Sequence, residues 1–270
     1  MTGEPDAEGD AVRERLRAQF GPNAANYATS RVHAAGSSLD RLVELLEPRA
    51  DWRTLDIATA AGHTAFALAP HVAEVVASDL LDEMLDVARA QAAERGIGNV
   101  SFEVADAEAL PFDDETFDAV TCRIAPHHFP RPGRFVAEVA RVLRPRGRFG
   151  LVDNMVGAEA SGFVNGFEKR RDPSHVRALS MEEWLELIAG AGLIVDSVEA
   201  RRKRMVFTAW ADNMSVPGEV RAELLADLER APAAAVDHLE PELGEPGDQD
   251  AAAFHLTEGI VVASAPGVDR

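Results

Sequence analysis

Three aspartates stand near the ends of three successive apolar runs of the chain. They are Asp56, Asp79 and Asp106. An acid at the end of a second strand, about 20 residues after the turn that follows the first, is placed to accept hydrogen bonds from both hydroxyls of a ribose. Asp79 fits this pattern. Asp106 can accept from the exocyclic amine of adenine, beside the backbone amide of Ala107. Any one of these acids could instead be a helix cap, but three in succession favour a nucleoside site.

The turn after the first run, "LDIATAAGHTA" (55–65), begins like a nucleotide-binding turn but lacks most of the glycines of such turns. Alanine occupies positions 58 and 60, and only Gly62 precedes the expected helix. An alanine methyl group is tolerable where φ is negative and obstructive where φ is positive. If the turn binds its ligand productively, we therefore expect a negative φ at Ala60 and a methyl group that points away from the ligand.

Titratable groups follow the fourth apolar run, in "CRIAPHHF" (122–129). Arg123 can meet an anionic group. His127 or His128 can remove a proton from an acceptor, because imidazole titrates near neutrality. The alternative is that Pro126 starts a short helix which the two histidines cap or pack. A reaction that depends mainly on alignment needs neither histidine, and we predict no metal site.

Two further segments supply candidate site residues. In "RDPSHVRALS" (171–180), His175 and Arg177 can face an acceptor pocket, although solvated loop residues are the favoured alternative. Tyr27, the only tyrosine, and Arg31 lie in an N-terminal stretch that can fold over the site. Ordinary helix packing with a solvated arginine explains that pair equally well.

The elements that must position these residues alternate between strand-like and helix-like segments from residue 52 onward. Strands separated by helices of this length form parallel βαβ units with right-handed crossovers. The expected product is an α/β fold with a doubly wound sheet, whose ligand lies at the carboxyl ends of the strands. The expected strands are 53–58, 74–79, 100–106, 117–125, 147–155, 193–200 and 256–265; the expected helices are "HTAFALAPHV", "LDEMLDVARAQAAERG", "RPGRFVAEVARVLRP", one capped by Ser180 and Glu183, and "PGEVRAELLADLERA".

Two regions flank this core. Residues 1–50 contain an acidic start and a short amphipathic stretch, and we expect an N-terminal tail and a helical lid there. Residues 205–270 hold a helical insertion, a Pro/Gly/Glu-rich stretch and the last strand. We interpret the insertion as a cap over the pocket of the core, residues 51–204. The three parts form one structural domain in this interpretation.

Four segments together resemble the class I S-adenosylmethionine-dependent methyltransferases. They are "LDIATAAG", "ASDLLDEML", "ADAEALPFDDETFDAVTC" and "FVAEVARVLRPRGRF", and the resemblance covers roughly residues 20–200. It is closest to the branch of ubiquinone/menaquinone C-methyltransferases and other small-molecule methyltransferases. The resemblance implies a Rossmann-like, seven-stranded sheet whose last strand, "GIVVASA", runs antiparallel.

The resemblance also implies a role for each candidate. S-adenosylmethionine has no phosphate, so the turn need not form the amide nest that a pyrophosphate demands. The family usually has three glycines in this turn, and only the third is present here. The implied cofactor-binding residues are Tyr27, Arg31, Asp56, Ala58, Ala60, Gly62, Asp79, Leu80, Met84, Asp106, Ala107 and Arg123. The acceptor-binding candidates are Tyr27, His128, His175 and Arg177, and the catalytic candidates are His127 and His128.

Composition narrows the class of protein. A formal net charge of −19 argues against a broad electrostatic footprint for nucleic acid, and the basic run at 201–204 is interpreted as a solvated strand end. The single cysteine, Cys122, excludes a disulfide framework within one chain and suits a reducing compartment. No signal pattern is present, and no apolar run approaches the ~20 residues that a membrane span needs.

These observations predict a cytoplasmic enzyme that transfers a methyl group from S-adenosylmethionine to oxygen or carbon of a small molecule, in specialised or quinone-type metabolism. Two alternatives stay open. One is an enzyme on the same scaffold that binds S-adenosylmethionine without methyl transfer, such as a cyclase or lyase. The other is a non-catalytic binding module. No nucleic acid, membrane or metal partner is expected, and the oligomeric state is left open, with a homodimer as one option.

Overall fold

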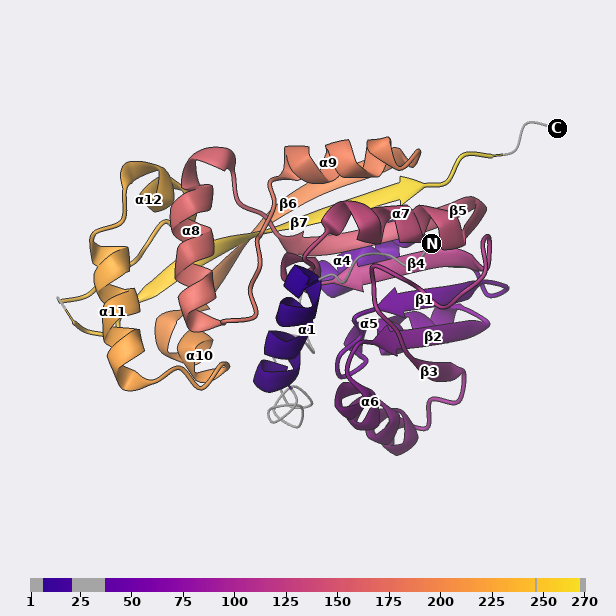
Figure 1. Ribbon diagram of the computed structural model, residues 1–270, viewed down its shortest axis with the longest axis horizontal. Coiled ribbons are helices and arrows are strands. Elements are labelled where there is room, and N and C mark those ends of the chain that lie inside the picture. The colour runs from indigo at the N-terminus through magenta and orange to yellow at the C-terminus, as the bar shows by residue number, and fades with distance from the viewer. Residues whose placement is uncertain (1–6, 21–36, 246, 268–270) are drawn as a thin grey trace.

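The computed structural model describes residues 7–20, 37–245 and 247–267. In this part of the chain seven strands form one sheet with the order β3-β2-β1-β4-β5-β7-β6 (Figure 1). The first five strands in the chain pair in parallel, and β7 runs antiparallel to β5 and β6. The strands are β1 (Arg53–Ile57), β2 (Glu74–Asp79), β3 (Val100–Val104), β4 (Phe117–Arg123), β5 (Leu143–Asn154), β6 (Ile194–Val206) and β7 (Ala253–Ser264). The predicted fold class is confirmed, including the antiparallel last strand.

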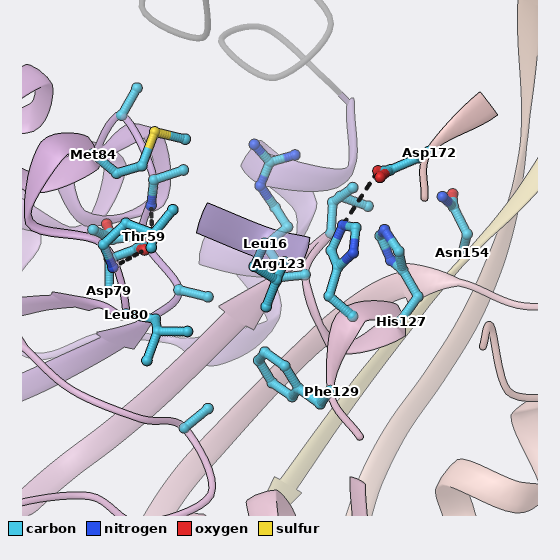
Figure 2. Close-up of a pocket in the computed structure, with 18 of the residues that line it drawn as sticks. Leu16, Thr59, Asp79, Leu80, Met84, Arg123, His127, Phe129, Asn154 and Asp172 are labelled. Carbon is cyan, nitrogen blue, oxygen red and sulfur yellow. Dashed lines mark hydrogen bonds and ion pairs between the residues drawn. The ribbon is translucent and has the colours of Figure 1, made fainter. Parts of the chain in front are cut away.

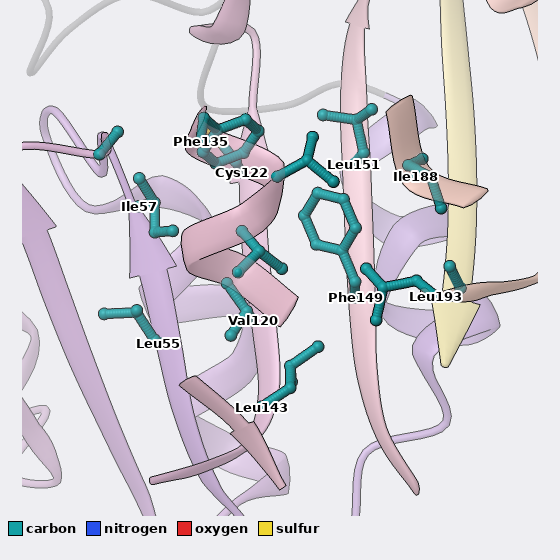
Figure 3. Packing of buried hydrophobic residues seen from close by; sticks show 14 of the residues in the cluster. Leu55, Ile57, Val120, Cys122, Phe135, Leu143, Phe149, Leu151, Ile188 and Leu193 are labelled. Carbon is teal, nitrogen blue, oxygen red and sulfur yellow. The ribbon is translucent and has the colours of Figure 1, made fainter. Parts of the chain in front are cut away.

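The central strands are continuous apolar runs because helices cover both of their faces. Phe149 and Leu151 of β5 pack with Phe135 and Ile188 from helices on one face of the sheet (Figure 3). Val152, the residue after Leu151, packs with Leu42 of α4 on the other face. The strand order reverses between β1 and β4, and this is the switch point at which an open α/β sheet leaves a crevice for its ligand.

Helices α7 and α9 lie in front of the sheet in Figure 1, and α4 lies behind it. Helix α9 starts with the predicted capping box: Glu183 N donates to Ser180 Oγ (3.2 Å), and Ser180 N donates to Glu183 Oε2 (2.9 Å). The elements flanking the sheet are α4 (Ser37–Leu46), α5 (His63–Leu68), α6 (Asp82–Arg95), α7 (Pro132–Val142), α9 (Met181–Gly190) and the 3₁₀ turns η2 (Ala69–His71) and η3 (Pro126–His128).

A second group of helices forms a cap beside the sheet. It consists of α8 (Ala158–Arg171), α10 (Phe207–Asp212), α11 (Gly218–Glu229) and α12 (Ala233–Leu239), which pack around the far ends of β6 and β7 (Figure 1). The helical insertion before the last strand is thus confirmed. Three helices of the cap were not predicted, however. Helix α8 lies between β5 and the segment at 171–180, where no element was assigned, and α10 and α12 were left unassigned too.

The basic run at 201–204 lies inside β6 rather than at its end, since the strand continues to Val206. Each of its four cations lies within ion-pair distance of a glutamate: Glu199, Glu240, Glu258 and Glu242 in turn. The charges of this run are therefore compensated by ion pairs within the fold.

The N-terminal helix α1 (Ala7–Phe20) lies between the cap and the sheet (Figure 1). Helix α4, which sequence analysis grouped with it, instead packs Leu42 and Leu46 into the core. The candidates Tyr27 and Arg31 lie outside the described residues. None of the described helices combines the length and the apolar character that crossing a membrane requires.

Candidate active site

A cavity of about 630 Å³ lies at the carboxyl ends of the parallel strands, under the cap. Asp56, Asp79 and Asp106 line one part of it, and His127 and His128 line another. Arg13 and Leu16 of α1 also contribute to the lining, as do Met205, Trp210, Met214 and Leu256 of the cap region. The structure thus brings together residues from α1, the ends of β1 to β5, η3 and the cap, and Figure 2 shows part of this lining.

The turn between β1 and α5 has three residues in the left-handed region of backbone space. The φ values are +52° at Ala58, +47° at Ala60 and +87° at Gly62. The predicted negative φ at Ala60 is therefore wrong. The turn keeps the backbone form that glycines would give it, and the alanines adopt that form at a cost of about 1–2 kcal/mol each.

Hydrogen bonds from both sides hold the turn in this form. Ala60 N donates to Asp79 Oδ2 (2.9 Å), and Thr59 N donates to Ser78 O (2.9 Å). Thr59 Oγ1 donates to Asp56 Oδ2 (2.6 Å). These bonds to β1 and β2 offset the strain at the two alanines.

Gly62 differs from the two alanine positions, because both its positive φ and the lack of space for a Cβ atom restrict which residue can occupy it. A Cβ atom at Gly62 would overlap the buried ring of Phe66. Alanine is therefore tolerable at positions 58 and 60, where only φ opposes it, but it would strain the turn severely at position 62. This explains why the third glycine of the pattern is the one that is present.

The positive φ gives a first prediction, for Ala60→Gly. Glycine relieves about 1–2 kcal/mol of left-handed strain and costs about 0.5–1 kcal/mol in backbone entropy. We expect the free energy of unfolding to rise by about 0.5–1 kcal/mol, measured by chemical denaturation. The control is Ala73→Gly, an exposed position without a positive φ, which should lower that free energy. A similar decrease for Ala60→Gly would contradict the strain at Ala60.

The acids at the ends of β1 and β2 are buried and hydrogen-bonded. Asp79 Oδ1 accepts from Leu81 N (3.0 Å) while Oδ2 accepts from Ala60 N. Asp56 accepts from Thr59 and, at Oδ1, from Thr121 Oγ1 (2.8 Å). Burial raises the pKa of both carboxyl groups to about 6, against the partial compensation of these hydrogen bonds. Each carboxylate keeps part of its acceptor capacity of about four lone pairs for a further donor.

The acid after β3 is engaged differently. Asp106 Oδ2 accepts from Arg13 Nε at 3.0 Å and lies 2.8 Å from Arg13 Nη2, so α1 is tied to the cavity at this point. Leu80, Met84 and Ala107 line the cavity with it. Adenine would share the Asp106 carboxylate with Arg13 or displace it.

His127 and His128 are neighbours with different partners. His127 Nδ1 lies 2.6 Å from Oδ1 of Asp153, a fully buried acid of β5. His128 Nδ1 lies 3.2 Å from the carbonyl oxygen of Ser174, and its Nε2 lies 3.9 Å from Asp172 Oδ2. Figure 2 shows Asp172 and Asn154 on the same side of the cavity as His127.

The two imidazoles also differ in basicity. Burial and the charge of His127 lower the pKa of His128 to about 3. Burial opposes protonation of His127 too, but the charge of Asp153 and the hydrogen bond to it outweigh burial and raise its pKa above the usual value. Of the two, only His127 is suited to hold a proton near neutral pH.

The remaining candidates have varied positions. Arg123 lines the cavity, and its Nε donates to Thr64 Oγ1 (3.2 Å). His175 and Arg177 do not belong to the cavity lining. His175 is buried, with Nε2 2.8 Å from Asn165 Oδ1, and burial lowers its pKa to about 2. The half-exposed Arg177 pairs with Glu183.

Several lining or supporting residues were not foreseen from the sequence: Arg13, Asp153, Asp172, Trp210 and Met214. Asp153 carried a usable signal, because it lies near the end of the fifth strand just as the three predicted acids lie near the ends of theirs. The others come from α1, from the end of α8 and from the region around α10, where no local pattern indicates a site. Within the described residues, no group of three or more histidine, cysteine, aspartate or glutamate side chains is arranged to hold a metal ion.

The sheet with its switch point, and the three acids that share one cavity there, define an α/β protein of the nucleoside-cofactor-binding class. Comparisons with known proteins agree. Residues 55–151 match the family model described as a methyltransferase domain. The chain is 38% identical over 214 residues to the uncharacterized methyltransferase YcgJ of Bacillus subtilis, spanning 78% of this chain and 85% of that protein. The chain belongs to the class I S-adenosylmethionine-dependent methyltransferase family.

Solved structures and a further relative extend the comparison. The crystal structure of YcgJ from Bacillus subtilis superposes with a TM-score of 0.81 at 35% identity, covering 85% of this chain and 98% of that chain. Demethylmenaquinone methyltransferase of Clavibacter sepedonicus is 44% identical over 101 residues, 37% of this chain and 40% of that protein. The [4+2]-cyclase SpnF shares the fold, with a TM-score of 0.57 at 21% identity over 85% of this chain and 80% of that chain.

Proposed function

We propose that this protein transfers the methyl group of S-adenosylmethionine to an oxygen or carbon atom of a small, partly apolar molecule. The observation that carries the proposal is the composition of one cavity. Strand-end acids that suit a nucleoside line one part, and a histidine paired with a buried acid lines another. Cofactor and acceptor can therefore meet inside a single cavity, as group transfer requires.

The residues at the strand ends fit S-adenosylmethionine. The carboxylate of Asp79 can accept from the ribose, since the backbone amides that it binds leave part of its acceptor capacity of about four lone pairs unused. Asp106 and Ala107 would read the adenine ring, with Leu80 and Met84 against its faces. The turn from Asp56 to Gly62 would hold the methionine part. When bound, the cofactor supplies an electrophilic methyl group on a sulfonium.

The acceptor part of the cavity is walled by apolar side chains and by charges that compensate one another. The apolar side chains are Phe129, Met205, Trp210, Met214 and Leu256. Lys203 Nζ donates to Glu258 Oε1 (2.7 Å), and Arg171 lies 3.3 Å from Glu168. This lining suits a neutral molecule such as a phenol or quinol. The name of the Clavibacter relative supports an acceptor of the quinone type.

A cytoplasmic location suits the single, buried cysteine.

The rival function is a cyclase or lyase that binds S-adenosylmethionine without methyl transfer. The likeness to SpnF concerns the fold alone, and function depends on the site rather than the fold. A histidine that lines the same cavity as the cofactor acids, and that is paired with the buried Asp153, favours methyl transfer to a group that must lose a proton.

The test follows the methyl group. Purified protein is incubated with S-adenosylmethionine labelled on the methyl carbon, alone and with a panel of phenols, quinols and amines, and the products are analysed by mass spectrometry. We expect label in a hydroxyl or ring-carbon product, with release of S-adenosylhomocysteine. Methylthioadenosine as the main product from cofactor alone would support the rival function. Failure to bind the cofactor would leave only a binding module.

A further inference from the structure

We infer that the acceptor is a molecule that loses a proton from a hydroxyl or acidic carbon when it is methylated, that His127 Nε2 takes this proton, and that Asp153 positions the His127 imidazole for this task. The inference rests on the proposed function and makes its acceptor class specific. It excludes acceptors that react through an already unprotonated amine, because an amine lone pair needs no base before it attacks.

The geometry of the pair fixes which nitrogen is available. Asp153 is fully buried, and its Oδ1 lies 2.6 Å from His127 Nδ1. A carboxylate only accepts hydrogen bonds, so Nδ1 must carry the hydrogen and donate. Nε2 of the neutral ring is then unprotonated. His127 itself lines the cavity, where an acceptor would lie.

The second oxygen of Asp153 strengthens this arrangement. Among the described residues, Asp153 Oδ2 is buried without a hydrogen-bond partner. Within the part of the chain that the structure describes, the His127 imidazole is thus the side chain that hydrogen-bonds to this carboxylate. A buried charge that is poorly balanced stabilises a cation beside it strongly, and the imidazolium formed by proton uptake is that cation.

The backbone around His127 holds the ring in place. The carbonyl oxygen of His127 accepts from Val176 N (2.9 Å) and Arg177 N (3.0 Å). The His128 ring lies 4.2 Å from the His127 ring, and the His175 ring lies 5.4 Å from it on a centroid basis. The segment at 171–180, which sequence analysis considered for acceptor binding, thus restrains the candidate base.

The charges that face His127 come from several elements. Asp153 lies on β5, Glu168 lies in α8 and Asp172 directly follows that helix; all three favour the protonated ring. His128 on η3 and His175 stay neutral because burial lowers the pKa of each, to about 3 and about 2. Because these two rings are neutral, they do not repel the imidazolium form of His127. His127 can therefore exist as a base and hold the proton after it is taken.

The proton and electron balance is as follows. The acceptor O–H or C–H bond breaks, its electron pair stays on the acceptor atom, and the proton goes to His127 Nε2. The acceptor atom forms a bond to the methyl carbon while the carbon–sulfur bond breaks and its electron pair stays on sulfur. The products are the methylated acceptor and S-adenosylhomocysteine, and the proton on the imidazolium then passes to solvent.

The first arm of the test needs no turnover. In ¹⁵N-histidine NMR spectra of the free protein, we expect the Nδ1–H tautomer of His127, with a strongly downfield proton. Asp153→Asn should weaken that signal and lower the pKa of His127. His175→Gln serves as the matched histidine control and should leave the His127 tautomer unchanged. An Nε2–H tautomer of His127 in the parent protein would overturn the positioning role.

The second arm uses methyl transfer to matched acceptors, a phenol and the aniline with the same ring. We expect transfer to the phenol, and Asp153→Asn should lower kcat roughly 10- to 100-fold, a part of what a positioned base supplies. The KM for the acceptor and the Kd for the cofactor should change little. The pH profile of kcat should lose the decrease near neutral pH that protonation of His127 causes. Phenol methylation insensitive to Asp153→Asn would overturn the inference while the proposed function stands. Transfer to the aniline alone would overturn the inference and also the oxygen or carbon acceptor of the proposed function. No transfer to any acceptor would contradict the proposed function itself.

Discussion

Replacement of Trp210 by alanine is expected to lower the free energy of unfolding by about 3–5 kcal/mol, the range for truncating a buried large aromatic side chain. Trp210 is 1% exposed and lies at the centre of the cap. Its ring stacks on Phe167 at 4.8 Å and meets Phe254 edge-on at 5.1 Å. The guanidinium of Arg171 lies over it at 4.9 Å. One side chain thus joins α8, α10 and β7.

The same side chain lines the acceptor part of the cavity, so its loss should also weaken acceptor binding more than cofactor binding. Chemical denaturation measures the change in stability. Calorimetry with S-adenosylmethionine measures the change in cofactor binding, and the KM for the acceptor reports the change in acceptor binding. Phe163→Ala provides the matched control, since Phe163 stacks on Phe167 at 6.2 Å but is only partly buried. We expect a clearly smaller destabilisation there. Equal effects at the two positions would show that Trp210 does not hold the cap together.

The acids at the strand ends could be predicted from sequence because two strong local signals coincide there. A buried parallel strand is a continuous apolar run, and its carboxyl end is where a polar residue must serve a ligand or a cap. Asp56, Asp79 and Asp106 were found in this way. The same rule would have found Asp153, but the fifth strand was read only as a structural element.

The cap was harder to predict because its helices depend on one another. Helix α8 contains Gly162, Asn165 and Gly166, residues with low helix propensity, in its middle. Its buried positions, Val164 and Phe167, have helical spacing but make a short stripe. That stripe is stable only against Trp210 and Phe254, which follow far along the chain, and local periodicity does not report such contacts.

The conformation of the turn failed as a prediction for a different reason. A negative φ was expected at Ala60 so that its methyl group would point away from the ligand. Left-handed strain at alanine also favours a negative φ, but that strain is small. The side chains of Asp56 and Asp79 and the carbonyl of Ser78 supply hydrogen bonds that outweigh it. A local preference of about 1–2 kcal/mol is regularly overridden by tertiary contacts of this kind.

Asp79→Asn is expected to raise the Kd for S-adenosylmethionine roughly 10- to 150-fold, because a hydrogen bond to a charged acceptor contributes about 1.5–3 kcal/mol. The asparagine keeps the shape of the side chain but places an NH₂ group against Ala60 N or Leu81 N, where both atoms now donate. It also removes the charge that the ribose hydroxyls would meet. Calorimetry measures the change. Asp82→Asn, an exposed neighbour in the first turn of α6, removes the same charge as a control and should leave the Kd nearly unchanged.

The pH dependence of binding tests the same carboxylate without a substitution. In the free protein the pKa values of Asp79 and Asp56 are about 6, above the ordinary 3.8, because both groups are buried. The folded protein therefore binds more protons than the unfolded chain between about pH 4 and 6, and these two groups make the free energy of unfolding fall as pH rises through that window. Cofactor binding has the opposite requirement, since the ribose needs an ionised Asp79. The Kd should be constant above pH 6 and rise as pH falls below it, less steeply in Asp79→Asn, where only Asp56 still titrates. A Kd that stays flat from pH 7 to 5 in the parent protein would show that the charge of Asp79 does not contribute to binding, even if the asparagine variant binds weakly for steric reasons.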